Sequence, residues 1–153
     1  MYSVIGFQNI LFGFDIMPVE VKYLDDGIGF NLSVTGIISG RDLFSEIENF
    51  YQSEHLITNR YGIIEFSCAA NNKITNFDVR AIAEISEKSS KIAPNRIIAL
   101  ISKSDVGFGL SRMWEILAEK TNWDTRVFRS RSDAEKWLRT KVFEKFNTII
   151  TLK

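Results

Sequence analysis

The stretch with the most potential for chemistry is residues 104–120, SDVGFGLSRMWEILAEK, which follow an apolar run. Gly107-x-Gly109-x-x-Arg112 stands between a predicted strand and a predicted helix, as a dinucleotide-binding loop would. The third glycine of that motif, which allows close packing of the helix on the strand, is replaced by Arg112. The next strand ends in Arg129, where a nucleotide site would carry an acid for the ribose. The pattern therefore does not favour a dinucleotide site.

Two other interpretations of this loop stay open. In the first, the glycines only supply the backbone freedom of a tight turn from strand to helix. In the second, the first N–H groups of the helix and Arg112 hold an anion or an acidic group of a partner. The candidate anion- or partner-binding site then comprises Ser104, Asp105, Gly107, Gly109 and Arg112.

The other reactive residue types form no catalytic constellation. His55 precedes a predicted strand at residues 61–67 and Cys68 follows it, which separates the two by roughly 20 Å at ~3.3 Å per residue. One histidine supplies neither a zinc triad nor a second base. Carboxylate pairs such as Glu46 and Glu48 are typical of solvated charges on a helix face. We therefore expect no enzymatic activity, no cofactor and no metal.

Bulk composition indicates one globular domain. The chain has 153 residues, 45% of them hydrophobic, and its single cysteine cannot form an internal disulfide, which fits a reducing compartment. The charged residues balance to a net charge of zero, which argues against general affinity for nucleic acid. The apolar start contains no basic residue before Lys22 and is too short to span a bilayer. We expect a cytoplasmic protein with no membrane span.

Hydrophobic periodicity predicts where the strands and helices lie. An antiparallel hairpin is predicted at residues 19–24 and 28–37, because both alternate apolar and polar side chains around Asp25-Asp26-Gly27. Further strands are predicted at residues 61–67, 96–102 and 124–129, and residues 147–152 also have a β-like pattern. Helices are predicted at residues 40–52, at 75–92 with a Thr75/Asp78 capping box, along the stripe from Leu110 to Ala118, and after a Ser132 cap.

This order, β-β-α-β-α-β-α-β-α, predicts an α/β fold with a mixed, mostly parallel sheet of four to five strands. Strands separated by helices are parallel neighbours with right-handed crossovers. The pattern allows helices on both faces of the sheet, or a half-open sheet with the helices mainly on one face. We expect the second arrangement.

The stretch IIALISKSDVGFGLSRMWEILAEKTNWDTRVFRSRSDAEKWL resembles the SpoIIAA-like (STAS-type) domains of bacterial proteins, which are allied to CRAL-TRIO lipid-binding domains. The residues that carry the resemblance are Gly107, Gly109, Arg112, Trp114, Val127, Phe128, Ala134, Trp137 and Leu138. The resemblance extends over residues 17–140. It implies an apolar N-terminal extension at residues 1–16, and a helix end with a β-like tail at residues 141–153.

The chain departs from the family at the loop after the third strand. In STAS regulators this loop carries an Asp-Ser-Ser-Gly-type motif whose serine is phosphorylated, whereas here it reads Ser-Cys-Ala-Ala-Asn-Asn-Lys over residues 67–73. The nearest hydroxyls are those of Ser67 and Thr75, and a helix cap already explains Thr75. These two residues are the candidate phosphorylation sites.

The resemblance and the lack of reactive clusters suggest a non-enzymatic module that acts through protein–protein contacts. The two apolar terminal segments suggest self-association as a homodimer. The alternative, from the CRAL-TRIO relation and the many aromatic residues, is a small-molecule or lipid carrier.

Overall fold

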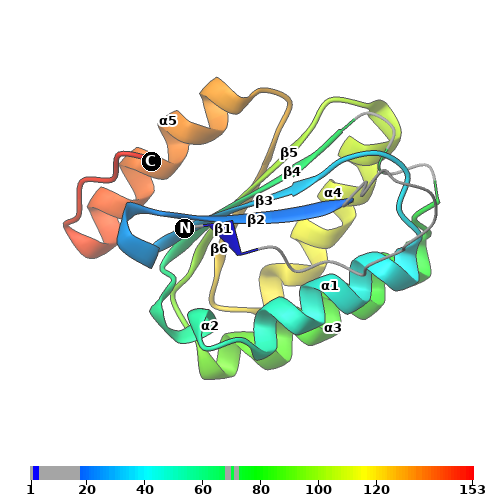
Figure 1. The fold of residues 1–153 in the computed structure, drawn as a ribbon, viewed down its shortest axis with the longest axis horizontal. Coiled ribbons are helices and arrows are strands. Elements are labelled where there is room, and N and C mark those ends of the chain that lie inside the picture. Colours follow the sequence, from blue (N-terminus) through cyan, green and yellow to red (C-terminus); the bar gives the residue numbers. More distant parts are fainter. Residues whose placement is uncertain (1, 4–17, 68–69, 71–72) are drawn as a thin grey trace.

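The computed structural model describes residues 2–3, 18–67, 70 and 73–153. They form an α/β structure around one mixed sheet with the strand order β1-β2-β3-β4-β5-β6 (Figure 1). The strands are β1 (Tyr2–Ser3), β2 (Val19–Leu24), β3 (Gly29–Val34), β4 (Tyr61–Phe66), β5 (Ile97–Ser102) and β6 (Asp124–Phe128). Strands β1, β2 and β3 pair antiparallel, and β3 to β6 pair parallel. The α/β class and the mixed sheet are confirmed, whereas the two-residue β1 had no signal in the sequence.

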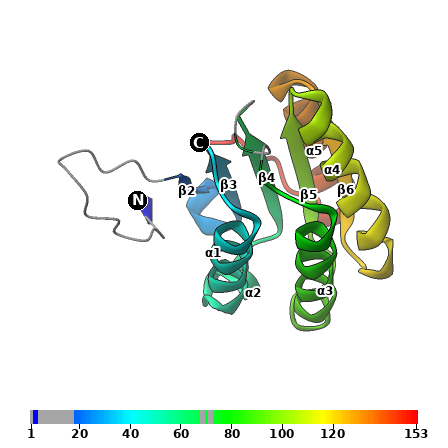
Figure 2. The ribbon, with the colours of Figure 1, turned by 90° about the vertical axis from the view of Figure 1, so that its right-hand side faces the viewer.

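The helices cover the two faces of the sheet unequally (Figure 2). The long helices are α1 (Gly40–Gln52), α3 (Asn76–Ile92), α4 (Asp105–Leu117) and α5 (Arg131–Phe146), and α2 (His55–Thr58) is a single turn. Helices α1, α3 and α4 pack with a hydrophobic core on one face. Helix α5 alone packs on the other face, over β4, β5 and β6.

Each face has its own core because alternate residues of a strand point to opposite sides. Phe30, Leu32 and Val34 of β3 contribute to the core beneath α1, α3 and α4. The core beneath α5 includes Ile63 of β4 and Leu138 of α5. All six residues of β5 are buried, as its continuous apolar run predicts for a strand covered on both faces.

Hydroxyl side chains fix where the long helices begin. Thr75 forms the predicted capping box with Asp78. The last helix begins one residue before the expected Ser132 cap: Ser130 is the cap, and its hydroxyl accepts from the Asp133 amide at 3.2 Å. The prediction of Ser132 as the cap was therefore wrong. Ser130 and Ser132 are each followed by an acidic residue three positions later, so the sequence pattern of a cap fits both serines.

The β-like tail predicted for residues 147–152 is also wrong, because this segment forms no strand. Asn147 has a left-handed backbone (φ 50°), which ends α5 and turns the chain back over it. Ile150 is then buried against the core beneath α5. Of the expected N-terminal extension, only Tyr2 and Ser3 lie within the described residues.

Candidate functional site

Five of the seven predicted site residues lie at one edge of the sheet, where β3, β4 and β5 end and α1, α3 and α4 begin: Ser67, Thr75, Ser104, Asp105 and Gly107. We call this the carboxyl edge; it is the right-hand end of Figure 1. The parallel pairing of β3, β4 and β5 brings these three strand ends together. Crevices at the carboxyl ends of strands are where open α/β sheets commonly bind ligands.

The two glycines of the opening motif lie inside α4, not in the turn before it. Ser104 caps this helix, and its hydroxyl accepts from the Gly107 amide at 3.0 Å. Among the described glycines only Gly27 and Gly36 have positive φ, so neither glycine of α4 uses its wide backbone freedom. The interpretation as a glycine-dependent tight turn is therefore wrong.

Arg112 is not brought to the start of α4. Its guanidinium pairs with Glu115 at 2.6 Å, on the exposed side of the same helix. Asp105, in the first turn, places a negative charge where an anion would bind. The structure therefore groups Ser104, Asp105 and Gly107 in one helix turn and directs Arg112 to a different partner.

Arg129, which the sequence interpretation did not assign to the site, is the cation at this position. Its Nη1 pairs with Asp105 at 2.8 Å and donates to the Lys103 carbonyl at 3.0 Å. The guanidinium also lies 4.2 Å from the centre of the Phe108 ring, within cation–π range. Arg129 directly follows β6, which is parallel to β5, so its position in the sequence could have placed it beside the end of β5.

The two candidate phosphorylation sites differ in environment. The Thr75 hydroxyl donates to the Asp78 carboxylate at 2.7 Å and accepts from the Asp78 amide at 3.3 Å, so it is fully used as a cap. The Ser67 hydroxyl is buried and has no hydrogen-bond partner among the described residues. A kinase would therefore have to displace neighbouring structure to reach Ser67.

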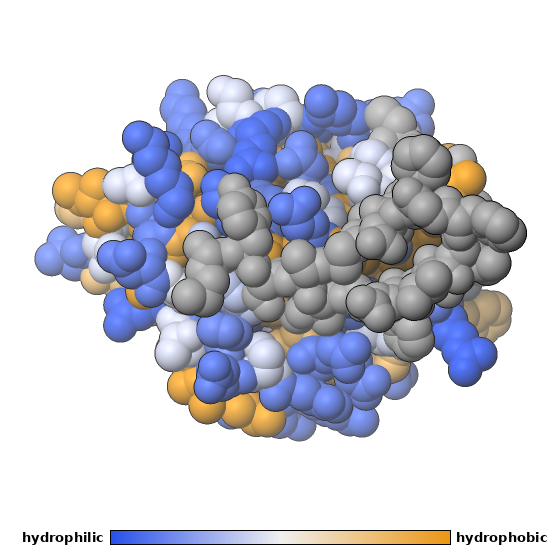
Figure 3. Space-filling view, in the orientation of Figure 1, coloured by the Kyte–Doolittle hydropathy of each residue, from blue (hydrophilic) through white to orange (hydrophobic). Residues whose placement is uncertain are grey.

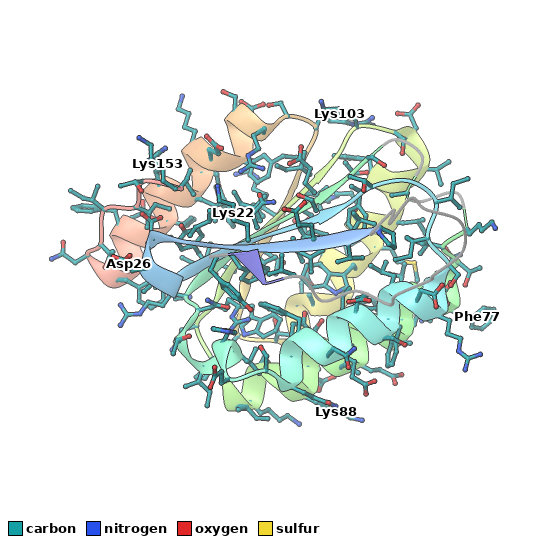
Figure 4. The ribbon with its side chains drawn as sticks, viewed as in Figure 1. Lys22, Asp26, Phe77, Lys88, Lys103 and Lys153 are labelled. Atoms are coloured by element: carbon teal, nitrogen blue, oxygen red, sulfur yellow. The ribbon has the colours of Figure 1, made fainter. Side chains whose placement is uncertain are left out.

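Three large apolar side chains are exposed at the carboxyl edge. Ile37 precedes α1, Phe77 is the second residue of α3 and Val106 is the second residue of α4, with exposed fractions of 58%, 83% and 62%. Phe77 projects away from the body of the protein in Figure 4. Each of the three stands at the end of an element and outside both hydrophobic cores.

An apolar cavity of about 50 Å³ lies between the sheet and helices α1, α3 and α4. Its walls include Leu43, Phe66, Val79, Leu110 and Trp114. The Trp114 indole N–H is buried and has no hydrogen-bond partner among the described residues. A cavity of ~150 Å³ holds one benzene molecule, so this one is too small for a lipid.

A polar cluster that the sequence interpretation missed lies at the start of α5, on the same face of the sheet as this helix. Arg131 bonds to Glu65 at 2.8 Å, to Asn31 at 2.7 Å and to Glu135 at 2.8 Å. Burial lowers the pKa of Arg131, but the bonds to Glu135 and Glu65 outweigh it and raise the pKa. The cluster fixes the start of α5 on the sheet. In the sequence, the single acidic residue in the apolar strand YGIIEF is the feature that could have indicated it.

In residues 18–67, 70 and 73–153, no three His, Cys, Asp or Glu side chains come together as a metal site. The imidazole of His55 packs against the Tyr23 ring at a tilt, with ring centres 4.1 Å apart, and Cys68 lies outside the described residues. None of the described helices is both long and apolar enough to cross a membrane.

Comparison with known proteins gives no match: no family model, no curated protein and no solved structure matches the chain.

Proposed function

We propose that this protein is a non-enzymatic binding module of STAS-like type that acts through protein–protein contacts at its carboxyl edge. The resemblance over residues 17–140 supports the STAS-like assignment. At this edge Thr75 and Ser104 cap helices and Asp105 pairs with Arg129, which supports binding over catalysis.

The exposure of Ile37, Phe77 and Val106 at one edge is the observation that carries the proposal. The three side chains precede or begin three different helices, so no single helix pattern explains their exposure. The Asp105–Arg129 pair beside Val106 supplies polar groups at the same edge. An apolar centre with a polar surround is the usual anatomy of a protein interface.

Site-specific photo-crosslinking in cells tests this proposal. A photo-reactive phenylalanine analogue is placed at position 77 and, as a matched control, at position 149, since Ile149 is equally exposed but follows α5 at the other end of the molecule. We expect a discrete protein adduct from position 77 and none from position 149. Equal adducts from both positions, or none from position 77, would contradict the proposal.

Homodimerisation through the terminal segments is a separate part of the proposal. Residues 150–152 at the C-terminus are bonded to their own chain, so a terminal interface would depend on the N-terminal segment. Light scattering coupled to size-exclusion chromatography compares the full chain with residues 17–153. A dimer that becomes a monomer on truncation is the expected result, and two monomers would exclude this interface.

A further inference from the structure

The starts of α1 and α3 form one continuous surface at the carboxyl edge. An isolated β-bridge joins Ser39, the cap of α1, to Lys73, which lies shortly before α3. A Cβ added to Gly40 would overlap the Asp78 carboxyl, so the first turns of the two helices are packed against each other. Exposed residues beside these two helix starts therefore lie close together.

This surface combines apolar and cationic side chains. Its apolar members are Ile37 and Phe77, and its cations are the exposed Arg41, Lys73 and Arg80. We call these five residues the α1–α3 patch. Lys73 stands four positions before Phe77 and Arg80 three positions after it, so Arg80 and Phe77 are neighbours on the surface of α3. In Figure 3, hydrophilic and hydrophobic residues lie side by side at the lower right, where α1 and α3 begin.

The cations of the patch have no anion to balance them. Within the described part of the chain, none of the ion pairs closer than 4 Å involves any of the three. The described acids in the first turns of α1 and α3 are Asp42 and Asp78. The Asp78 carboxylate already accepts from the Thr75 amide and hydroxyl, both at 2.7 Å. The patch therefore offers more positive than negative charge to another molecule.

We propose that the α1–α3 patch binds an acidic segment of a partner protein. One large apolar side chain of the segment lies against Ile37 and Phe77, and its carboxylates pair with the three cations. The guanidinium groups of Arg41 and Arg80 suit carboxylates because each can donate two parallel hydrogen bonds. This inference rests on the protein–protein function proposed above and names the chemistry of the partner. Complementary charge of this kind contributes to specificity and to the rate of association.

The number and placement of charges favour a peptide segment over a membrane. Anionic membranes are typically bound by clusters of ~4–8 Lys and Arg, whereas the patch has three cations. The exposed carboxylates of Asp42 and Asp105 stand at the same edge, and a uniformly negative bilayer would repel them. A peptide can place its acids opposite the cations alone.

Selection from a phage-displayed library of random peptides of about twelve residues tests the chemistry of the partner, with the wild-type protein as the target. We expect the enriched peptides to carry a net negative charge and at least one large apolar residue. The same selection against a variant with Arg41→Gln, Lys73→Gln and Arg80→Gln should lose the enrichment of acidic residues. All three side chains are exposed, so this variant should fold as the wild type does.

Fluorescence polarisation with the most enriched peptide measures the contribution of each part of the patch. Phe77→Ala should weaken binding at least tenfold, and Arg80→Gln at least threefold. Raising the NaCl concentration from ~50 to ~500 mM should also weaken binding, because salt screens exposed charges. Lys91→Gln removes a cation from the last turn of the same helix, so it is the matched control and should bind as the wild type does.

Enriched peptides that are neutral or basic would overturn the proposal, as would no enrichment or an unchanged affinity in Phe77→Ala. Sedimentation with phosphatidylserine vesicles is the second arm: binding that the triple variant loses would assign the patch to a membrane and overturn the peptide proposal. Crosslinking at position 77 separates this inference from the proposed function. A discrete adduct there together with neutral or basic peptides removes only the acidic partner, whereas the lack of an adduct removes the protein–protein function itself.

Discussion

Asp25 and Thr151 lie 126 positions apart in the chain and are joined by two hydrogen bonds. The Asp25 Oδ1 accepts from the Thr151 amide at 2.8 Å and from its hydroxyl at 2.6 Å. The other carboxylate oxygen accepts from the Leu152 amide at 3.0 Å and from the Tyr61 hydroxyl. One side chain in the β2–β3 turn thus holds the C-terminal tail over the core beneath α5.

Asp25→Asn should destabilise the protein by about 1–3 kcal/mol, the usual effect of losing hydrogen bonds to a charged group. An amide presents only one acceptor oxygen, so it cannot serve the donors on both sides of the carboxylate. Asparagine tolerates the left-handed backbone of this residue (φ 47°), so backbone strain does not contribute to the measured loss of stability. Urea denaturation at pH 7 measures the difference. Asp26→Asn, at the exposed neighbouring turn position, is the control and should change stability by less than about 0.5 kcal/mol.

The stabilisation from Asp25 should depend on pH. Burial by itself raises the pKa of Asp25, but the bonds from Thr151, Tyr61 and Leu152 outweigh it, so the pKa is lowered below its ordinary value of 3.8. The unfolded chain therefore takes up this proton first, and the stabilisation is present above about pH 5 and lost as the pH falls through the folded pKa. The difference in unfolding free energy between wild type and Asp25→Asn should shrink from pH 5 to pH 3. A difference that stays constant over this range would show that the carboxylate charge is not involved.

Two serine variants distinguish the real cap of α5 from the expected one. Ser130→Ala removes the hydroxyl that accepts from the Asp133 amide and should cost about 1 kcal/mol. Ser132→Ala keeps the cap and replaces a residue of the first helical turn with a better helix former, so stability should be unchanged or slightly higher. Thermal denaturation of both variants gives the comparison. The opposite ranking would place the start of α5 at Ser132.

Two glycine variants test whether glycine is needed at the starts of α4 and α1. A Cβ at Gly109 would meet nothing within 4 Å, so Gly109→Ala should stabilise α4 by about 0.5–1 kcal/mol. A Cβ at Gly40 would overlap the Asp78 carboxyl, which is held in the capping box of α3. Gly40→Ala should therefore destabilise the protein in chemical denaturation. Destabilisation by Gly109→Ala would instead point to a close backbone contact at α4.

Much of the fold follows from local sequence signals. The alternation in VEVKYL places β2, the apolar stripe over residues 40–52 places α1, and Thr75 with Asp78 marks the start of α3. These signals involve residues within one or two turns of each other, so their physical basis is present in the sequence. Where two local patterns compete, as at Ser130 and Ser132, the choice depends on how the helix packs.

The candidate site was less predictable. Ser104 and Asp105 were expected between a strand and a helix and lie there, between β5 and the first turn of α4, but the partner of Asp105 is Arg129, from a different strand end. Arg112 was assigned by its spacing in a phosphate-loop motif, and one helical turn directs it to Glu115 instead. Spacing along the chain therefore indicated that these residues begin a helix after a strand, without indicating which charges meet there.

The sequence by itself determined the α/β class, the position of most elements and the presence of only one histidine and one cysteine. Only the tertiary structure decided that Asp25 holds Thr151, that Arg131 joins Asn31 to Glu65, and that Arg96 is buried with two of its nitrogens unbonded among the described residues. The physical reason is that periodicity and caps depend on neighbours in the chain, whereas a buried charge or a long-range hydrogen bond depends on which distant residues the sheet order brings together.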